Sequence, residues 1–200
     1  MFALRFPMLA LAILSSFFAI GSLAQQPELS KIQIVAAGEI GHRWERQILE
    51  HVRENLWIQT DIHRIDAVTN GVVSQMPSFC LDTPATSNTV TVCIVDGPVP
   101  ECGANVGAFD LYPEKQCGVV WASCLKPVAE AGDADADGVW LARIQKQTGF
   151  VAARLLGHHE CPFWLCVMHT DASMDDLDSK ARGLCPPCLD EMRSRLGLPD

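Results

Sequence analysis

Apolar and polar residues alternate or cluster along the chain in ways that predict both strands and helices. Residues 31–37 alternate, with Ile32 and Ile34 on one face, which is typical of a strand. Residues 42–57 place apolar side chains every three or four positions among charged ones, and this spacing predicts an amphipathic helix. Further strands are expected over residues 61–65, 89–95 and 118–122. A strand–helix–strand opening of this kind indicates an α/β domain.

Two more helices are expected in the C-terminal third. Residues 139–156 repeat apolar side chains such as Trp140 and Ile144, and Gly157 follows as a stop. A short helix is expected over residues 190–196, beyond the last cysteine. The predicted order is therefore a strand, a helix, three strands and two helices.

The first 24 residues differ in character from the rest. Arg5 precedes an apolar run, and small residues at Ser22 and Ala24 stand before Gln25, which is the pattern of a cleavable secretory signal. An uncleaved membrane anchor is the alternative, because the apolar run is close to spanning length. We therefore expect residues 1–24 to be a signal peptide and residues 25–200 to form one domain, periplasmic or secreted, with no membrane contact after cleavage.

Charge narrows the classes of partner. The formal net charge is −9, which argues against a nucleic-acid partner and against a basic membrane-binding surface. Nine cysteines are many for an exported chain of this length. Five of them form at most two disulfides, so one thiol is left over: Cys80, Cys93, Cys102, Cys117 and Cys124.

The other four cysteines form two close pairs near the C-terminus. Cys161 and Cys166 are separated by four residues, and Cys185 and Cys188 by two. Such pairs are typical of two chain segments that hold one tetrahedral metal, and zinc fits the thiolate ligands best. Two disulfides are the alternative, because thiols tend to pair in an oxidising compartment. The spacing predicts one structural Zn²⁺ site.

The same stretch carries a family resemblance. The order Gly157, Cys161-x4-Cys166, Val167-Met168, Cys185-x2-Cys188 resembles the C-terminal signature of the archaemetzincins, which are zinc-dependent metallopeptidases with the pattern HExxHxxGxxHC-x4-C-x-M followed by CxxC. The flanking residues Lys146, Asp178 and Lys180 are also similar to that family. The resemblance implies a metzincin-like α/β fold, with a mixed sheet, packed helices and a C-terminal four-cysteine zinc clip.

The catalytic positions depart from the family pattern. Counting back from Cys161 puts Phe150 at the first histidine, Val151 at the catalytic glutamate, Arg154 at the second histidine and Glu160 at the third. Phenylalanine and valine neither bind zinc nor accept a proton, and an arginine is always charged and repels a cation. We expect Arg154 and Glu160 to pair in place of the lost metal, with Phe150 filling the remaining apolar space.

Three functions remain open at this point. The leading hypothesis is an exported archaemetzincin-like pseudo-peptidase that keeps the structural zinc, has no catalytic residues left and binds a peptide or protein in the old cleft. An active zinc peptidase with unusual ligands is the second, and its candidate residues are His158, His159, Glu160 and His169. No His-x3-His pair supports it. A disulfide-stapled binding module without metal is the third.

Overall fold

The structure is a computed structural model of the whole chain, and it describes residues 31–38, 40, 42–65, 80, 89–97, 102, 108–128 and 135–198. The predicted signal peptide lies outside these residues. Among the described residues, no helix has both the length and the apolar character needed to cross a membrane.

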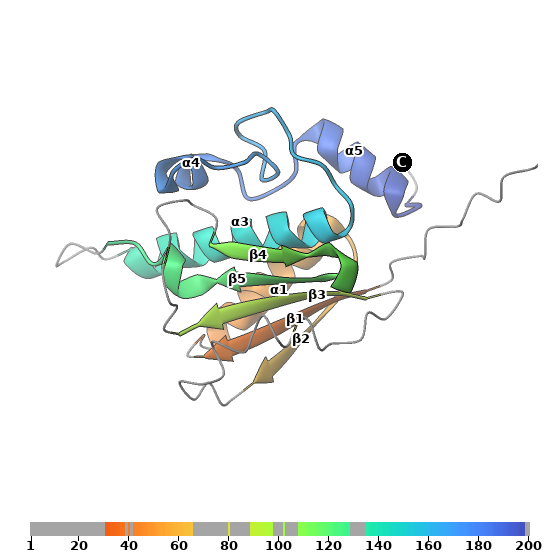
Figure 1. Cartoon of the computed structure of the whole chain (residues 1–200). Coiled ribbons are helices and arrows are strands. Elements are labelled where there is room, and N and C mark those ends of the chain that lie inside the picture. The colour runs from red at the N-terminus through yellow and green to blue at the C-terminus, as the bar shows by residue number, and fades with distance from the viewer. Residues whose placement is uncertain are drawn as a thin grey trace, which may run out of the picture.

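A five-stranded mixed sheet forms the centre of the fold (Figure 1). Its strand order is β2-β1-β3-β5-β4. The first four strands in this order are parallel, and β4 at the edge runs antiparallel to β5. The strands are β1 (Lys31–Gly38), β2 (Gln59–Ile65), β3 (Thr89–Asp96), β4 (Phe109–Tyr112) and β5 (Cys117–Trp121). The predicted strands are confirmed to within two residues at each end, and the fold class is confirmed.

The three central strands β1, β3 and β5 are buried on both faces, because their alternate residues enter two different cores. Ile32 and Ile34 of β1 face the larger core together with Val92 of β3. On the opposite face, Val35 packs with Cys93 in a smaller cluster. Two-sided burial explains why these strands are rich in β-branched residues along their whole length.

Two helices cover the larger core. Helix α1 (His42–Leu56) lies against helix α3 (Ala136–Leu155), and Trp44 meets Trp140 edge to face at 4.5 Å between ring centroids. The Trp140 indole donates a hydrogen bond to the Ala122 carbonyl at 2.6 Å, in the short 3₁₀ turn η3 (Ala122–Leu125) that follows β5. A second 3₁₀ turn, η2 (Pro113–Lys115), links β4 to β5. These contacts fix α3 against the sheet.

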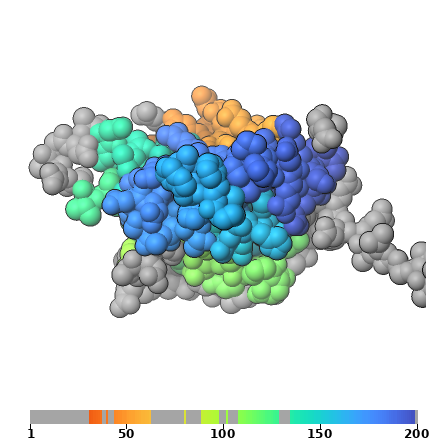
Figure 2. Space-filling view, turned by 90° about the horizontal axis from the view of Figure 1, so that it is seen from above, coloured from red at the N-terminus to blue at the C-terminus, as the bar shows by residue number. Residues whose placement is uncertain are grey.

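The C-terminal segment forms a further layer over α3 (Figures 1 and 2). It contains α4 (Met174–Ser179) and α5 (Pro186–Arg195). As a result α3 is covered on nearly all sides, and eleven consecutive residues, 143–153, are buried. The sequence pattern did not predict α4, although Ser173 caps it by accepting a hydrogen bond from the Asp176 amide at 3.1 Å.

The prediction for the last helix is wrong in its start. We expected it beyond the last cysteine, but α5 begins at Pro186 and contains Cys188. Two prolines in the first turn explain the earlier start, because proline lacks only an amide that is unpaired there anyway and its φ already suits a helix.

Candidate metal centre

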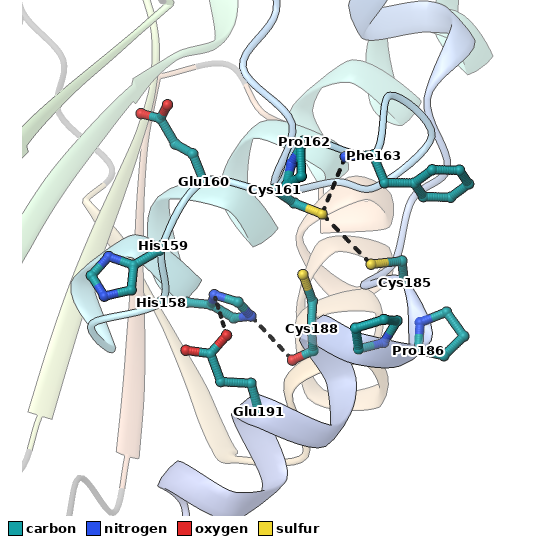
Figure 3. Close-up of a pocket in the computed structure, with 11 residues that line it drawn as sticks. His158, His159, Glu160, Cys161, Pro162, Phe163, Cys185, Pro186, Cys188 and Glu191 are labelled. Atoms are coloured by element: carbon teal, nitrogen blue, oxygen red, sulfur yellow. Dashed lines mark hydrogen bonds and ion pairs between the residues drawn. The ribbon is translucent and has the colours of Figure 1, made fainter.

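The four C-terminal cysteines converge on one place. Their sulfur atoms all lie within 4.8 Å of one another, and Cys161 Sγ is 3.7 Å from Cys185 Sγ (Figure 3). A tetrahedral zinc with Zn–S bonds of about 2.3 Å places its sulfurs about 3.8 Å apart. The observed spacing therefore fits a single four-coordinate ion. All four are free thiols, whereas four other cysteines of the chain are joined in disulfides.

Backbone amides point at the sulfurs. The Phe163 amide donates to Cys161 Sγ at 3.4 Å, and the Met168 amide donates to Cys166 Sγ at 3.5 Å. The Cys185 amide also donates to Cys166 Sγ, at 3.3 Å, and so links the two halves of the cluster. Hydrogen bonds of this kind stabilise thiolates, which are the form that binds metal.

The segments that carry the cysteines are held together by their backbones. The Cys161 amide donates to the Met168 carbonyl at 3.0 Å, which closes the loop around the first pair. The Val167 amide donates to the Gly183 carbonyl at 3.1 Å, and this bond joins the first pair to the segment before the second. The cluster is thus a property of the folded C-terminal layer.

Burial and hydrogen bonds shift the pKa values of the clustered thiols in opposite directions. Burial raises the pKa of Cys166, and burial together with the neighbouring Cys185 raises the pKa of Cys188. Burial also acts to raise the pKa of Cys185, but hydrogen bonds from the Cys188 backbone and from nearby thiols outweigh it and lower that pKa. A bound divalent cation would favour all four thiolates, so metal binding at this site releases protons.

Two histidines brace the cluster from outside. The buried His158 donates from Nε2 to the Cys188 carbonyl at 3.1 Å, and its Nδ1 lies 3.7 Å from Glu191. His169 donates from Nδ1 to the Cys161 carbonyl at 3.0 Å. Both therefore help to orient the segments that carry the cysteines. In the described part of the chain, the groups that could hold a metal consist of cysteines.

The remaining five cysteines form two disulfides and leave one free thiol, as their odd number predicted. Cys80 pairs with Cys117 and Cys102 with Cys124, and Cys93 is left as a buried free thiol. The sulfur atoms of Cys80, Cys93 and Cys117 also lie within 4.8 Å of one another. Two of them share a disulfide, so this trio is not a second candidate metal centre.

The positions that match the family's catalytic helix are filled by apolar side chains. Phe150 is buried in α3 and packs on Phe109 of β4, with 5.2 Å between the ring centroids. Val151 is fully buried against Gly118 of β5, where an added Cβ would lie 2.6 Å from its Cγ1. Neither residue offers a metal ligand or a base, and both act as packing between α3 and the sheet.

The expected pair between Arg154 and Glu160 forms, but loosely. Arg154 Nη1 lies 3.8 Å from Glu160 Oε1, and the Glu160 side chain is 57% exposed. Figure 3 shows its carboxylate pointing away from the cysteine sulfurs. A single exposed contact of this length contributes about 0 to 1 kcal/mol. The pair therefore does little to hold the turn after α3 against that helix.

Three buried cations fasten the C-terminal layer instead. Arg143 makes a two-bond contact to Asp178 at 2.8 and 2.6 Å, and Lys146 Nζ donates to the Leu177 carbonyl at 2.7 Å. Lys180 Nζ lies 5.5 Å from the Phe150 ring centroid and pairs with the buried Asp171 at 2.5 Å. Lys146, Asp178 and Lys180 are similar to the family in sequence, but their buried contacts were not predicted, because the burial of a charge leaves no periodic pattern in the sequence.

Comparisons with known proteins find similar folds among solved structures only. No protein-family profile matches the chain, and no curated protein sequence matches it either. Among solved structures, it is similar to an archaemetzincin from Methanopyrus kandleri, with a TM-score of 0.64 and 18% identity over 88% of this chain and 99% of that one. It is also similar to an archaemetzincin from Archaeoglobus fulgidus in complex with malonate, with a TM-score of 0.59 and 17% identity over 80% of this chain and 99% of that one.

A third similar structure is a zinc-dependent peptidase from Methanocorpusculum labreanum, with a TM-score of 0.60 and 16% identity over 80% of this chain and 99% of that one. Identities this low show the fold alone. The sheet order, the buried helix α3 and the C-terminal layer with its four-cysteine cluster thus make up an archaemetzincin-like fold.

Proposed function

We propose that this chain is an exported archaemetzincin-like protein that holds one structural zinc ion and does not hydrolyse peptides. The observation that carries the proposal is the content of α3. Phe150 and Val151 are 4% and 0% exposed and pack against β4 and β5. A metallopeptidase needs ligands that leave one coordination position open and a base beside the bound water. These two positions supply neither.

The zinc would be held by Cys161, Cys166, Cys185 and Cys188. Four thiolates complete a tetrahedral shell, so the ion has no free position for water or substrate and serves the fold. Its contribution would be to tie the loop after α3 to the start of α5, two segments that lie far apart in the sequence. The free thiols and the amides aimed at their sulfurs support metal over disulfides at this place.

An active peptidase with other ligands is less well supported. His158 is 2% exposed, and its ring contacts the Cys188 carbonyl and Glu191. His169 contacts the Cys161 carbonyl. Each of these rings already serves the cysteine cluster, and Glu160 points away from it (Figure 3).

A peptide or protein could still bind beside the old catalytic positions. Strand β4 ends the sheet order and pairs with β5 along one side, so its other side is unpaired within the described sheet. An extended peptide can add to such an edge through backbone hydrogen bonds without any metal. Phe109, on this strand, is in contact with Phe150 and would lie beside the bound chain.

Metal content and hydrolysis, measured on the same full-length preparation, test the proposal. We expect one tightly held zinc per chain by mass spectrometry of the metal and no cleavage of a mixed peptide library. A matched variant with Phe150→His, Arg154→His and Glu160→His restores three ligands and should bind a second zinc. Chelator-sensitive cleavage by the unaltered protein would contradict the proposal, and so would a preparation without zinc.

A further inference from the structure

A pocket lies beside the cysteine cluster (Figure 3). Its volume is about 590 Å³, within the range of about 300 to 1,000 Å³ that is typical of small-molecule sites. Its walls come from the segment after α3 and from the first turns of α5. Cys161, Cys185 and Cys188 line it but Cys166 does not, so the pocket lies to one side of the four sulfurs and is not the space between them.

Most of the wall is apolar, and part of it is exposed to solvent. Pro162, Phe163, Pro186 and Pro187 contribute to the lining, and all four are exposed residues. Phe163 is 47% exposed, although it is a large aromatic residue. A ring that enters the pocket can pack on the Phe163 ring and lie against the proline rings. The shape and chemistry of this wall therefore favour a flat apolar ligand.

Hydrogen-bond donors are scarce in the lining. The prolines have no amide hydrogen. The amides of Phe163 and Cys185 are directed at sulfur atoms of the cluster, at 3.4 and 3.3 Å. His158 Nε2 donates to the Cys188 carbonyl. Among the described residues, no lysine or arginine lines the pocket. An anion, or a ligand that only accepts hydrogen bonds, therefore finds few partners here.

An acceptor, by contrast, is in place at the edge of the pocket. Glu191 Oε1 accepts two hydrogen bonds from Arg195, at 2.9 and 2.8 Å. Glu191 Oε2 accepts none from the described residues and lies 3.7 Å from His158 Nδ1, which is too far for a hydrogen bond. The Glu191 side chain is 41% exposed, so a ligand can reach it. Because Arg195 balances its charge, the carboxylate does not require a cationic ligand, and Oε2 can accept a bond from a neutral donor.

We propose that this pocket binds a neutral, flat apolar molecule that carries one O–H or N–H group, such as a phenol or an indole. The ring lies against Phe163 and the prolines, and the donor binds Glu191 Oε2. A ligand that displaces water from this carboxylate must replace the lost hydrogen bond with one of its own. Glu160 is not part of the site, because its carboxylate pairs with Arg154 and points away from the sulfurs (Figure 3).

The inference goes beyond the proposed function, because it involves neither the residues of α3 nor hydrolysis. It requires the folded C-terminal layer, whose cysteines form part of the wall. Zinc content is therefore measured on the same preparation as ligand binding. Ligand binding without zinc would contradict the zinc proposal alone, and zinc without ligand binding would contradict the pocket proposal alone.

Two probes of nearly equal size separate the effect of the donor from that of the apolar ring. The first, 2-naphthol, carries one hydroxyl group, whereas 2-methoxynaphthalene has the same ring system and no donor. Both are titrated into the full-length protein and followed by calorimetry. We expect 2-naphthol to bind about tenfold more tightly, because a hydrogen bond to a charged acceptor contributes about this factor. The additional methyl group alone would favour 2-methoxynaphthalene, so the order of the two affinities identifies the hydrogen bond.

Paired variants locate the bound probe. Phe163→Ala removes the aromatic wall and should weaken the binding of both probes about three- to tenfold. Trp164→Ala removes an exposed neighbour that is not among the lining residues and should change neither affinity. Glu191→Leu removes the acceptor and should abolish the preference for 2-naphthol. Arg195→Leu breaks the same ion pair from its other side but leaves both carboxylate oxygens, so the preference should remain.

The four altered side chains are all partly or largely exposed, so these variants should fold, and circular dichroism checks that they do. With 2-naphthol, shifts of the backbone amide resonances in NMR spectra should concentrate in residues 158–163 and 185–191. Equal binding of the two probes, or tighter binding of 2-methoxynaphthalene, would overturn the proposal. So would a preference for 2-naphthol that survives in Glu191→Leu, resonance shifts concentrated elsewhere, or no binding of either probe up to its solubility limit.

Discussion

Single buried charges carry much of the attachment of the C-terminal layer. Lys180 is 3% exposed, and its ammonium donates to the His169 carbonyl at 3.0 Å and pairs with Asp171. Burial lowers the pKa of Lys180 and raises the pKa of Asp171 in spite of their contact. The pair therefore costs desolvation energy, and each partner depends on the other.

Removal of one partner should thus be more harmful than removal of both. We expect Lys180→Met to lower the free energy of unfolding by about 3 to 5 kcal/mol, because it leaves Asp171 buried without its cation. Addition of Asp171→Leu should recover a large part of this loss. Urea unfolding measures both. The control is Lys31→Met, which breaks the half-exposed contact to Asp61 and should cost no more than about 1 kcal/mol. Equal losses in the two single variants would contradict this account.

Cys93 is predicted to be an unreactive thiol in the folded protein. It is fully buried in β3, and burial raises its pKa to about 12. The thiolate is the reactive form, so Cys93 should resist alkylation in the native protein at pH 8 and react only after unfolding. Iodoacetamide labelling followed by peptide mapping checks this. Early labelling of Cys93 would mean that the smaller core opens more easily than its packing indicates.

At the scale of elements, α3 and the sheet are matched closely in shape. Gly118 in β5 leaves room for Val151, and the Asp110 carbonyl oxygen would lie 3.2 Å from a Cβ at the same position. A side chain at residue 118 must therefore push against both a helix and a neighbouring strand. The apolar residue at 151 is fitted to a glycine that faces it across the interface.

This fit predicts a coupled pair of substitutions. Gly118→Ala should destabilise the protein by about 1 to 3 kcal/mol through overpacking. In a Val151→Ala background the same change should cost less, because the clash with Cγ1 is gone, although the carbonyl contact remains. Thermal or urea unfolding of the four proteins gives the coupling energy, which we expect to be about 0.5 kcal/mol or more. A coupling energy near zero would show that the sheet shifts to accept the methyl group.

At the scale of the whole molecule, the positive charge of a residue in the C-terminal layer acts on a buried histidine of α1. His51 is 8% exposed, and its Nδ1 lies 3.2 Å from the Asn55 amide nitrogen. Burial and the positive charge of Arg182 lower the pKa of His51 to about 4. The folded protein therefore holds this ring neutral at neutral pH.

Stability should accordingly depend on acid through this residue. The unfolded chain takes up a proton at His51 near pH 6.5, whereas the folded protein does so only near pH 4. The contribution is fully present above pH 6.5 and is lost as the pH falls toward 4, by on the order of 3 kcal/mol. The change His51→Gln should flatten the pH dependence of the unfolding free energy in this window. An unchanged slope in urea titrations at several pH values would refute the assignment.

Several features of this protein follow from its sequence alone. Strands β1, β2, β3 and β5 and the long helices have periodic apolar residues that are independent of their neighbours in space, and they were predicted to within a few residues, whereas the short edge strand β4 was not predicted. The spacing of Cys161, Cys166, Cys185 and Cys188, together with Gly157 and Met168, predicted both the fold and the convergence of the cysteines. The presence of phenylalanine at position 150 and arginine at position 154, in place of histidines, is likewise visible in the sequence.

Other features were decided only by the tertiary structure. The pairing of Cys80 with Cys117, the burial of Lys180 and Lys146, and the pocket beside Cys161 depend on which distant segments meet. The loose contact between Arg154 and Glu160 is a further case, because the sequence showed the two charges but not their exposure. Local patterns specify elements through backbone periodicity, whereas desolvation, access and the pairing of charges arise only when those elements pack together.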